Sequence, residues 1–243
     1  MDHKLLGKAA LVTGGAKRIG RAIALTLAAA GADVTLTYRT SADDAVETVD
    51  AIEQLGRKAF AIECNVRSEV SVQGAVAYAF ARHKRLDILV NNAGLFEAAP
   101  LDKITLAQWD AVFETNTRGP FLVARAALPH LRVTHGCIIN MGSLGGLRPW
   151  ASHAHYCASK AAVHMLTQAM AKAFAPEVAV NCVAPGWIEM EQEKGTVSSR
   201  FAAKTPMQRN GTASDVAKAV LYFAASAPFV TGQILTVDGG LGL

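Results

Sequence analysis

Apolar, β-rich segments alternate with segments of helical periodicity along the whole 243-residue chain. The alternation predicts seven strands, near residues 8–13, 32–38, 58–63, 86–90, 136–141, 178–183 and 233–237. Between them it predicts helices near residues 18–30, 42–55, 68–82, 105–132, 153–174 and 213–225. Strands joined by helical crossovers form parallel sheets that are buried on both faces, and the 51% share of apolar residues suits such a sheet. We therefore expect an α/β fold: a doubly wound, mostly parallel, seven-stranded sheet with helices on both faces.

The first predicted strand ends in a glycine-rich turn that leads directly into the first predicted helix. The turn reads Thr13-Gly-Gly-Ala-Lys-Arg-Ile-Gly20. Glycines at such a turn let the backbone approach a pyrophosphate, which then lies on the free N–H groups of the helix. An ordinary tight turn would need no ligand, but the second apolar strand follows at the distance typical of a Rossmann-type dinucleotide site. No Pro/Gly/Ser-rich linker divides the chain, so we expect one dinucleotide-binding domain over residues 1–243.

Tyr156 and Lys160 lie four residues apart in a predicted helix, thirteen positions after Ser143. Residues four apart share a helix face, so the phenol and the ammonium group can point into one site. A neighbouring positive charge would draw the pKa of Tyr156 from about 10 towards neutrality, against the opposing effect of burial. A phenol with such a pKa could transfer a proton at physiological pH. Tyr and Lys at this spacing are also common on exposed helix faces, so the pair gains weight only from the rest of the chain.

Charge and cysteine usage exclude several classes of function. The net charge of +4 is spread along the chain without a Lys/Arg block, so we expect no nucleic-acid partner. No apolar run reaches the roughly 18 residues of a membrane span. The histidines include His153 and His155, with no carboxylate or Cys judged to stand at ligand spacing beside them, so we expect no metal site. The cysteines are far apart and no signal peptide is visible, which predicts a reducing, cytoplasmic location. These cysteines are Cys64, Cys137, Cys157 and Cys182.

Taken in order, the motifs resemble those of the short-chain dehydrogenase/reductase family, and the match covers essentially the whole chain. Besides the glycine turn, they are Asn91-Asn92-Ala93-Gly94, Asn116, Ser143, Tyr156-x-x-x-Lys160 and Pro185-Gly186. Each motif alone is a weak pattern. All of them in this order and at these separations are specific.

The resemblance implies a chemistry for four residues. Tyr156 would be the general acid for ketone reduction, or the base for alcohol oxidation, and Lys160 would lower its pKa and hold the nicotinamide ribose. Ser143 would hydrogen-bond the substrate oxygen as charge develops there. Asn116 would hold a water molecule in a proton relay. The hydride would come from the cofactor, so the protein would supply orientation and a proton.

Departures from the family pattern predict NADPH rather than NADH. Arg18 replaces a glycine of the turn, and the second strand ends in Tyr38-Arg39-Thr40 where members that prefer NAD usually carry an Asp. Two cations and nearby hydroxyls without an acid predict a pocket for a 2′-phosphate, although Arg39 could also be a solvated loop cation. The resemblance implies a larger set of cofactor-binding residues: Gly14, Arg18, Ile19, Gly20, Tyr38, Arg39, Thr40, Asn65, Val66, Asn92, Ala93, Gly94, Tyr156, Lys160, Pro185, Gly186 and Ile188.

Two further positions depart from the family pattern on the cofactor side. Asn65-Val66 replaces a common Asp-Val pair, and the Asn65 amide can still bond adenine. Met190 stands where the family often has a Thr that bonds the nicotinamide carboxamide, so carboxamide anchoring would depend on the backbone near Ile188.

The substrate is less well defined by the sequence. Ser143, Phe96 and Trp187 are the candidate substrate-binding residues, and the polar segment 187–205 is either a substrate lid or a solvated loop. The turn variant with Arg18 and the segment around Phe96 resemble pteridine reductases, in which a matching Phe stacks on a flat ring. Those enzymes typically carry Asp at the position of Ser143, so we favour a ketone reductase similar to 3-oxoacyl carrier-protein reductases, with pteridine reduction as the alternative. A non-catalytic NADP(H)-binding redox sensor is a third hypothesis, which the presence of all four catalytic residues disfavours.

The resemblance also implies self-association. Family members usually form a helix bundle between subunits, and the Ala-rich segments 105–132 and 153–174 would provide it. We therefore expect a homotetramer that acts on a small carbonyl or alcohol substrate.

Overall fold

The computed structural model describes residues 4–189, 201–225 and 229–243. Its seven strands form one sheet in the order β3-β2-β1-β4-β5-β6-β7, and all six strand pairings are parallel. This confirms the expected doubly wound α/β fold. The strands are β1 (Ala9–Val12), β2 (Asp33–Tyr38), β3 (Ala59–Glu63), β4 (Ile88–Asn91), β5 (Cys137–Met141), β6 (Ala179–Pro185) and β7 (Ile234–Val237).

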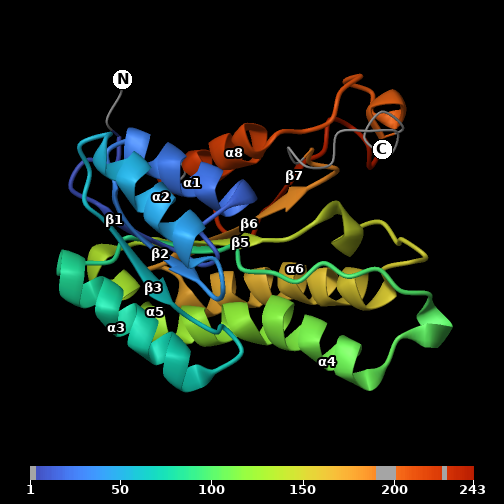
Figure 1. The fold of residues 1–243 in the computed structure, drawn as a ribbon, viewed down its shortest axis with the longest axis horizontal. Coiled ribbons are helices and arrows are strands. Elements are labelled where there is room, and N and C mark those ends of the chain that lie inside the picture. Colours follow the sequence, from blue (N-terminus) through green and yellow to red (C-terminus); the bar gives the residue numbers. More distant parts are fainter. Residues whose placement is uncertain (1–3, 190–200, 226–228) are drawn as a thin grey trace.

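Helices cover both faces of the sheet, as Figure 1 shows. One face carries α1 (Arg18–Ala29), α2 (Ala42–Glu53) and α8 (Ala213–Ala225), which pack over a hydrophobic cluster that includes Ile23, Ile52 and Val220. The other face carries α3 (Glu69–His83), α5 (Gly119–Thr134) and α6 (Ala154–Phe174) over a second cluster. Burial on both faces explains why the strands are nearly all apolar. In the described residues, no helix combines the length and the apolar character that crossing a membrane requires.

The segment expected to form one helix over residues 105–132 forms two helices with a π-helical turn between them. α4 (Leu106–Phe113) begins at a capping box between Thr105 and Gln108, and the π-turn spans Glu114–Arg118 before α5. Such turns add one residue to the backbone ladder and frequently occur at functional sites. Here the π-turn contains Asn116, whose side chain bonds groups outside the helix, as described below.

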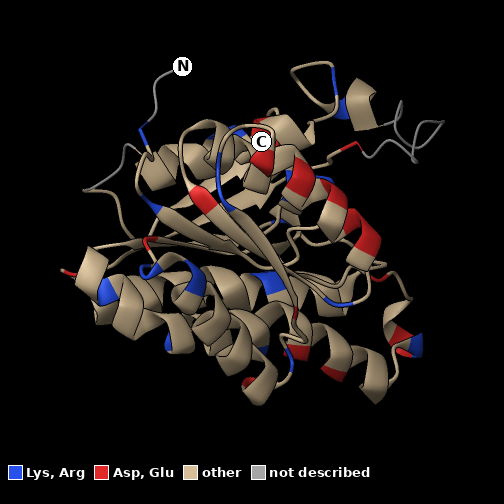
Figure 2. Ribbon diagram, turned by 60° about the vertical axis from the view of Figure 1, so that its left-hand side comes forward, with Lys and Arg blue, Asp and Glu red and all other residues tan. Residues whose placement is uncertain are grey.

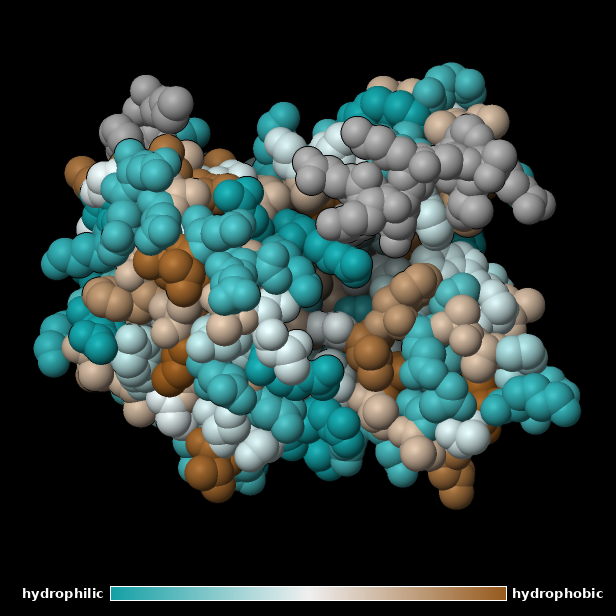
Figure 3. All heavy atoms as spheres, viewed as in Figure 1, coloured by the Kyte–Doolittle hydropathy of each residue, from teal (hydrophilic) through white to brown (hydrophobic). Residues whose placement is uncertain are grey.

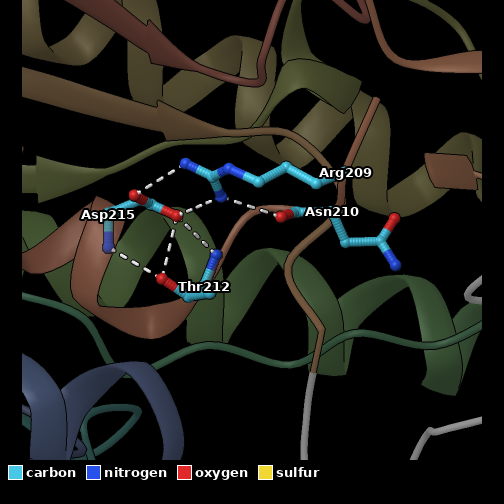
Figure 4. Close-up of polar contacts among 4 residues, drawn as sticks. All are labelled: Arg209, Asn210, Thr212 and Asp215. Carbon is cyan, nitrogen blue, oxygen red and sulfur yellow. Dashed lines mark hydrogen bonds and ion pairs between the residues drawn. The ribbon is translucent and has the colours of Figure 1, made fainter. Parts of the chain in front are cut away.

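Residues that follow the undescribed segment 190–200 are tied to the start of α8 (Figure 4). Thr212 and Asp215, three residues apart, form a reciprocal capping interaction: the Asp215 N–H donates to Thr212 Oγ1 (3.2 Å) and the Thr212 N–H donates to Asp215 Oδ2 (2.9 Å). Arg209 donates to both oxygens of the same carboxylate, at 2.7 and 3.1 Å. The Arg209 guanidinium therefore holds the pKa of Asp215 well below its usual range.

Lysines and arginines are distributed over helices and loops in Figure 2, and one helix carries a row of acidic residues. The row lies on α2, whose first turn contains Asp43 and Asp44. Acidic residues in a first turn face the positive end of the helix dipole. In this view the basic residues form no continuous band along the ribbon.

Candidate active site

A cleft of about 490 Å³ opens at the carboxyl ends of the central strands. In parallel α/β sheets, ligands bind at this edge, where the strand order reverses on either side of β1 and β4. Figure 3 shows the surface hollowed near its centre, with hydrophobic side chains along one side. Every residue that the sequence nominated for cofactor or substrate contact lies in the lining of this cleft, and Asn116 lies behind it. Lining residues that the sequence analysis did not single out include Lys17, Ser41, Leu95, Met141, Gly142 and Trp150.

The glycine turn after β1 is closely packed against the loop after β4. Gly14 has φ +61°, and a Cβ at position 20 would lie 2.1 Å from the Gly14 carbonyl oxygen, so neither glycine can be replaced without movement. The Asn92 side-chain amide donates to the carbonyl oxygens of Thr13 and Gly14, both at 2.9 Å. These contacts hold the backbone of the turn in the lining of the cleft. A pyrophosphate fits such a cradle.

Arg18 adopts a backbone conformation that normally favours glycine. Its φ is +53°, and L-residues in this region cost roughly 1–2 kcal/mol. Its side chain lines the cleft together with Arg39 and Thr40 at the end of β2. The turn therefore accepts backbone strain at the one position where the chain replaces a family glycine with a cation.

Tyr156 and Ser143 both line the cleft, and the Ser143 hydroxyl favours the ionised form of the Tyr156 phenol. Ser143 Oγ accepts from the Gly145 N–H (3.0 Å), which holds the hydroxyl oxygen in place at the start of the turn after β5. Burial raises the pKa of Tyr156 above its ordinary value, since the phenolate would lose hydration. The expectation that Lys160 would lower this pKa towards neutrality is therefore wrong for this arrangement, because desolvation outweighs the other effects.

Lys160 lies on the same side of α6 as Tyr156, with its Nζ 5.8 Å from the centroid of the Tyr156 ring. The ammonium donates to the Met141 carbonyl oxygen (2.8 Å) at the end of β5. Only 6% of Lys160 is exposed, and burial lowers its pKa to about 8. The spacing rule thus placed the two groups correctly, whereas the direction in which each pKa moves depends on burial that spacing does not reveal.

Asn116 uses its side chain to hold the loop after β4. Its Oδ1 accepts from the Leu95 N–H (2.7 Å), and its Nδ2 donates to the Leu95 carbonyl oxygen (2.9 Å) and to Ser159 Oγ (3.0 Å). Gly94 lies between Asn116 and Lys160, because a Cβ there would be 3.5 Å from Asn116 Oδ1 and 3.8 Å from Lys160 Nζ. The observed role of Asn116 is to tie Leu95, and hence Phe96 beside it, to the π-turn and to α6.

His164 is a further residue of the site that the sequence analysis missed. It accepts a hydrogen bond from the Ser143 N–H on its Nε2 (3.4 Å) and lies one helical turn after Lys160. A Cβ at position 142 would be 2.3 Å from its Nε2, and one at position 146 would be 2.6 Å from its Cε1. Burial, and then the nearby Lys160, lower the pKa of His164 to about 4. The sequence does contain a feature that indicates this position: His164 is four residues after Lys160, and this spacing places its ring on the same helix face.

The predicted lid is described only at its two ends. Trp187 lies in the cleft lining after β6, and its ring stacks on Phe201 with centroids 4.1 Å apart. Ile188 forms a β-bridge with Gly211, which links the segment after β6 to the residues that directly precede α8. Residues 190–200, including Met190, lie outside the described residues.

Comparisons with known proteins agree with this geometry. A family model described as enoyl-(acyl carrier protein) reductase matches residues 14–242. The chain is 38% identical to 3beta-hydroxysteroid dehydrogenase 1 of Eggerthella lenta, over 100% of this chain and 97% of that protein. It is 35% identical to a 3-oxoacyl-(acyl-carrier-protein) reductase of Staphylococcus epidermidis, over 97% of this chain and 99% of that protein.

A solved structure of a short-chain dehydrogenase from Burkholderia cenocepacia, in complex with NADP, superposes with a TM-score of 0.94. That protein is 40% identical, and the match covers 99% of this chain and 100% of the other. The family model and the relatives both span nearly the whole chain, so the protein belongs to the short-chain dehydrogenase/reductase family of nicotinamide-dependent oxidoreductases.

Proposed function

We propose that this protein is an NADPH-dependent ketone reductase in which Tyr156 is the proton donor. The observation that carries the proposal is that the hydroxyl-bearing residues Tyr156 and Ser143 line one cleft together with Lys160, whose Nζ lies 5.8 Å from the Tyr156 ring. Because burial raises the pKa of Tyr156, the phenol is protonated at physiological pH and is ready to act as an acid. An acid is what the reduction direction requires.

The nicotinamide, when bound, supplies the hydride to the carbonyl carbon. Ser143 would donate a hydrogen bond to the carbonyl oxygen as negative charge develops there, and Tyr156 would transfer its proton to the same oxygen. Lys160 would stabilise the resulting phenolate and hold the ribose hydroxyls. Asn116 and His164 would keep the loops that carry Phe96 and Ser143 in position.

Preference for NADPH is proposed from the charges at the other end of the cleft. Arg18, Arg39 and Thr40 line it there, and Tyr38 stands where an acidic residue would repel a phosphate. Guanidinium groups bind phosphate through charge-assisted hydrogen bonds. The NADP complex of the similar Burkholderia protein supports this choice.

The substrate class is proposed from Ser143 and from the relatives. A serine at this position suits a carbonyl oxygen, and the similar proteins include enzymes named for 3-oxoacyl and hydroxysteroid substrates. Pteridine reduction remains the second candidate, because Phe96 lines the cleft with half of its surface exposed. A redox sensor is the least economical reading, since Tyr156, Ser143 and Lys160 share the cleft.

The test is NADPH oxidation across a panel of ketones, quinones and biopterin. Turnover of ketones above the others supports the proposal. Turnover of biopterin alone would establish the second candidate instead. If no compound is turned over while NADPH binds tightly, the redox sensor becomes the better description.

We also propose a homotetramer that associates through α5 and α6. Phe121 on α5 and Met165 on α6 expose 41% and 66% of their surfaces, so both helices offer apolar side chains to a partner subunit.

A further inference from the structure

Three aromatic side chains line the cleft that contains Tyr156: Phe96, Trp150 and Trp187, here called the aromatic wall. They come from three separate segments, namely the loop after β4, the loop before α6 and the segment after β6. Hydrophobic side chains also border the hollow in Figure 3. Neither the general reductase chemistry nor NADPH binding requires aromatic rings at these positions.

Phe96 is held on one face and open on the other. Its ring stacks on His153 with centroids 4.7 Å apart and planes 17° apart, and its edge meets the Tyr156 ring at 4.8 Å and 85°. Burial lowers the pKa of His153, so the imidazole behind Phe96 is neutral at physiological pH. With 54% of its surface exposed, Phe96 presents its uncovered face to the cleft.

Trp150 and Trp187, the other two residues of the aromatic wall, also pack against neighbouring aromatic rings. Trp150 lies nearly parallel to Tyr156, at 14° and 6.2 Å, and meets the edge of His153 at 5.8 Å. Trp187 stacks on Phe201 at 4.1 Å and 6°. Aromatic pairs of this geometry attract each other beyond their burial, so the wall keeps its shape before any ligand arrives. A surface organised in advance binds a rigid partner without paying for ordering.

The wall contains no charge. Among the described lining residues, the cations are Lys17, Arg18, Arg39 and Lys160, and the first three lie on the turn after β1 or at the end of β2. Lys160 is buried and donates to Met141. Arg148, near the wall in sequence, donates through Nε to the Gly242 carbonyl oxygen. Among the described lining residues, a carboxylate or phosphate on the substrate would therefore find no counter-charge supplied by the aromatic wall.

We infer that the natural substrate is a ketone on a flat aromatic ring system, bound with its ring against the aromatic wall and its carbonyl oxygen at Ser143 and Tyr156. The inference rests on the proposed function and narrows it. It disfavours a flexible acyl thioester, which would lose chain entropy on binding and would leave the ring faces without a matching partner. The cleft of about 490 Å³ must also admit the cofactor, so the ring system would be small.

The test compares 2-tetralone with trans-2-decalone, which share a bicyclic skeleton and an unconjugated carbonyl but differ in one aromatic ring. We expect kcat/KM for NADPH-dependent reduction to be about tenfold higher for the tetralone, although the decalone is the more apolar compound. The N-acetylcysteamine thioester of acetoacetate, which represents acyl substrates, should be poorer than both. Saturable quenching of tryptophan fluorescence by 2-tetralone, which the decalone does not reproduce, gives a readout independent of turnover.

Phe96→Leu should reduce the tetralone-to-decalone ratio to near one, because leucine keeps apolar bulk but offers no ring face. Phe229→Leu is the matched control, since Phe229 is fully exposed outside the cleft, and it should keep the ratio. Equal kcat/KM values for the two bicyclic ketones, or a higher value for the thioester, would overturn the inference and leave ketone reduction intact. Failure of all three compounds and of the wider ketone panel would instead count against the proposed function, and the inference would fall with it.

Discussion

At the scale of single residues, Arg18 shows a compromise between folding and binding. Its positive φ destabilises the folded state, and a glycine at this position would remove that strain. Part of the gain would be lost, because glycine also increases the conformational entropy of the unfolded chain. We predict that Arg18→Gly raises the free energy of unfolding by up to about 1 kcal/mol and weakens NADPH binding about tenfold, with little change for NADH. Denaturant unfolding and fluorescence titration measure the two effects.

Lys84 provides the matched control for Arg18. It also has a positive φ (+60°), at the end of α3 and away from the cleft lining. Lys84→Gly should give a similar gain in stability and leave both dissociation constants unchanged. Equal loss of NADPH and NADH affinity in Arg18→Gly would show that the guanidinium does not recognise the 2′-phosphate.

His164 predicts a specific dependence of stability on pH. Its pKa is about 4 in the folded protein and about 6.5 when unfolded, so the unfolded state binds more protons between these values. Stability therefore falls as pH drops from 6.5 to 4, by about 3 kcal/mol from this group, and this contribution stops changing below pH 4. His164→Gln should remove that part of the slope, as measured by urea unfolding across the range. The exposed His135→Gln is the control, and parallel curves for wild type and His164→Gln would refute the assignment.

At the scale of elements, the cap of α8 allows a test of how side-chain hydrogen bonds stabilise the start of this helix. Asp215 accepts from Arg209, Thr212 and the Thr212 backbone (Figure 4). Asp215→Asn should cost about 1 kcal/mol and lower Tm by roughly 2–4 °C in calorimetry. Asp43→Asn is the control, because α2 has no side-chain cap at its N-terminus. Equal shifts in the two variants would mean that the cap adds nothing beyond helix charge.

The helices and strands also show which parts of the fold can be predicted from the sequence. Periodicity predicted the seven strands and the helices between them, except for the division of residues 105–132 into two helices, because apolar spacing is a local property of the chain. It could not predict the π-turn at Asn116, since that turn depends on partners at Leu95 and Ser159 that are distant in sequence. The order of the motifs predicted that Tyr156, Ser143 and Lys160 lie in one site. The directions of the pKa shifts of Tyr156 and Lys160 could not be predicted, because they depend on burial. Trp150 carried no motif, and only the folded chain places it beside Tyr156.

At the scale of the whole molecule, the exposed apolar residues of α5 and α6 predict association. Light scattering should give a mass near four times that of one chain. Met165→Lys places a charge in the proposed interface and should yield a smaller species, because an unpaired charge there loses its hydration. Lys172→Glu on the exposed end of α6 tests whether any charge change has this effect. A wild-type protein that remains monomeric at high concentration would contradict the proposal.

The central claim is that the Tyr156 hydroxyl donates the proton in NADPH-dependent ketone reduction, and Tyr156→Phe tests it most directly. This variant removes one oxygen atom and keeps the ring that contacts Phe96 and Trp150. We predict that kcat falls at least about 100-fold, as is typical for loss of a general acid, while the dissociation constant for NADPH stays within about twofold. A variant that keeps more than about a tenth of the wild-type rate would contradict the claim.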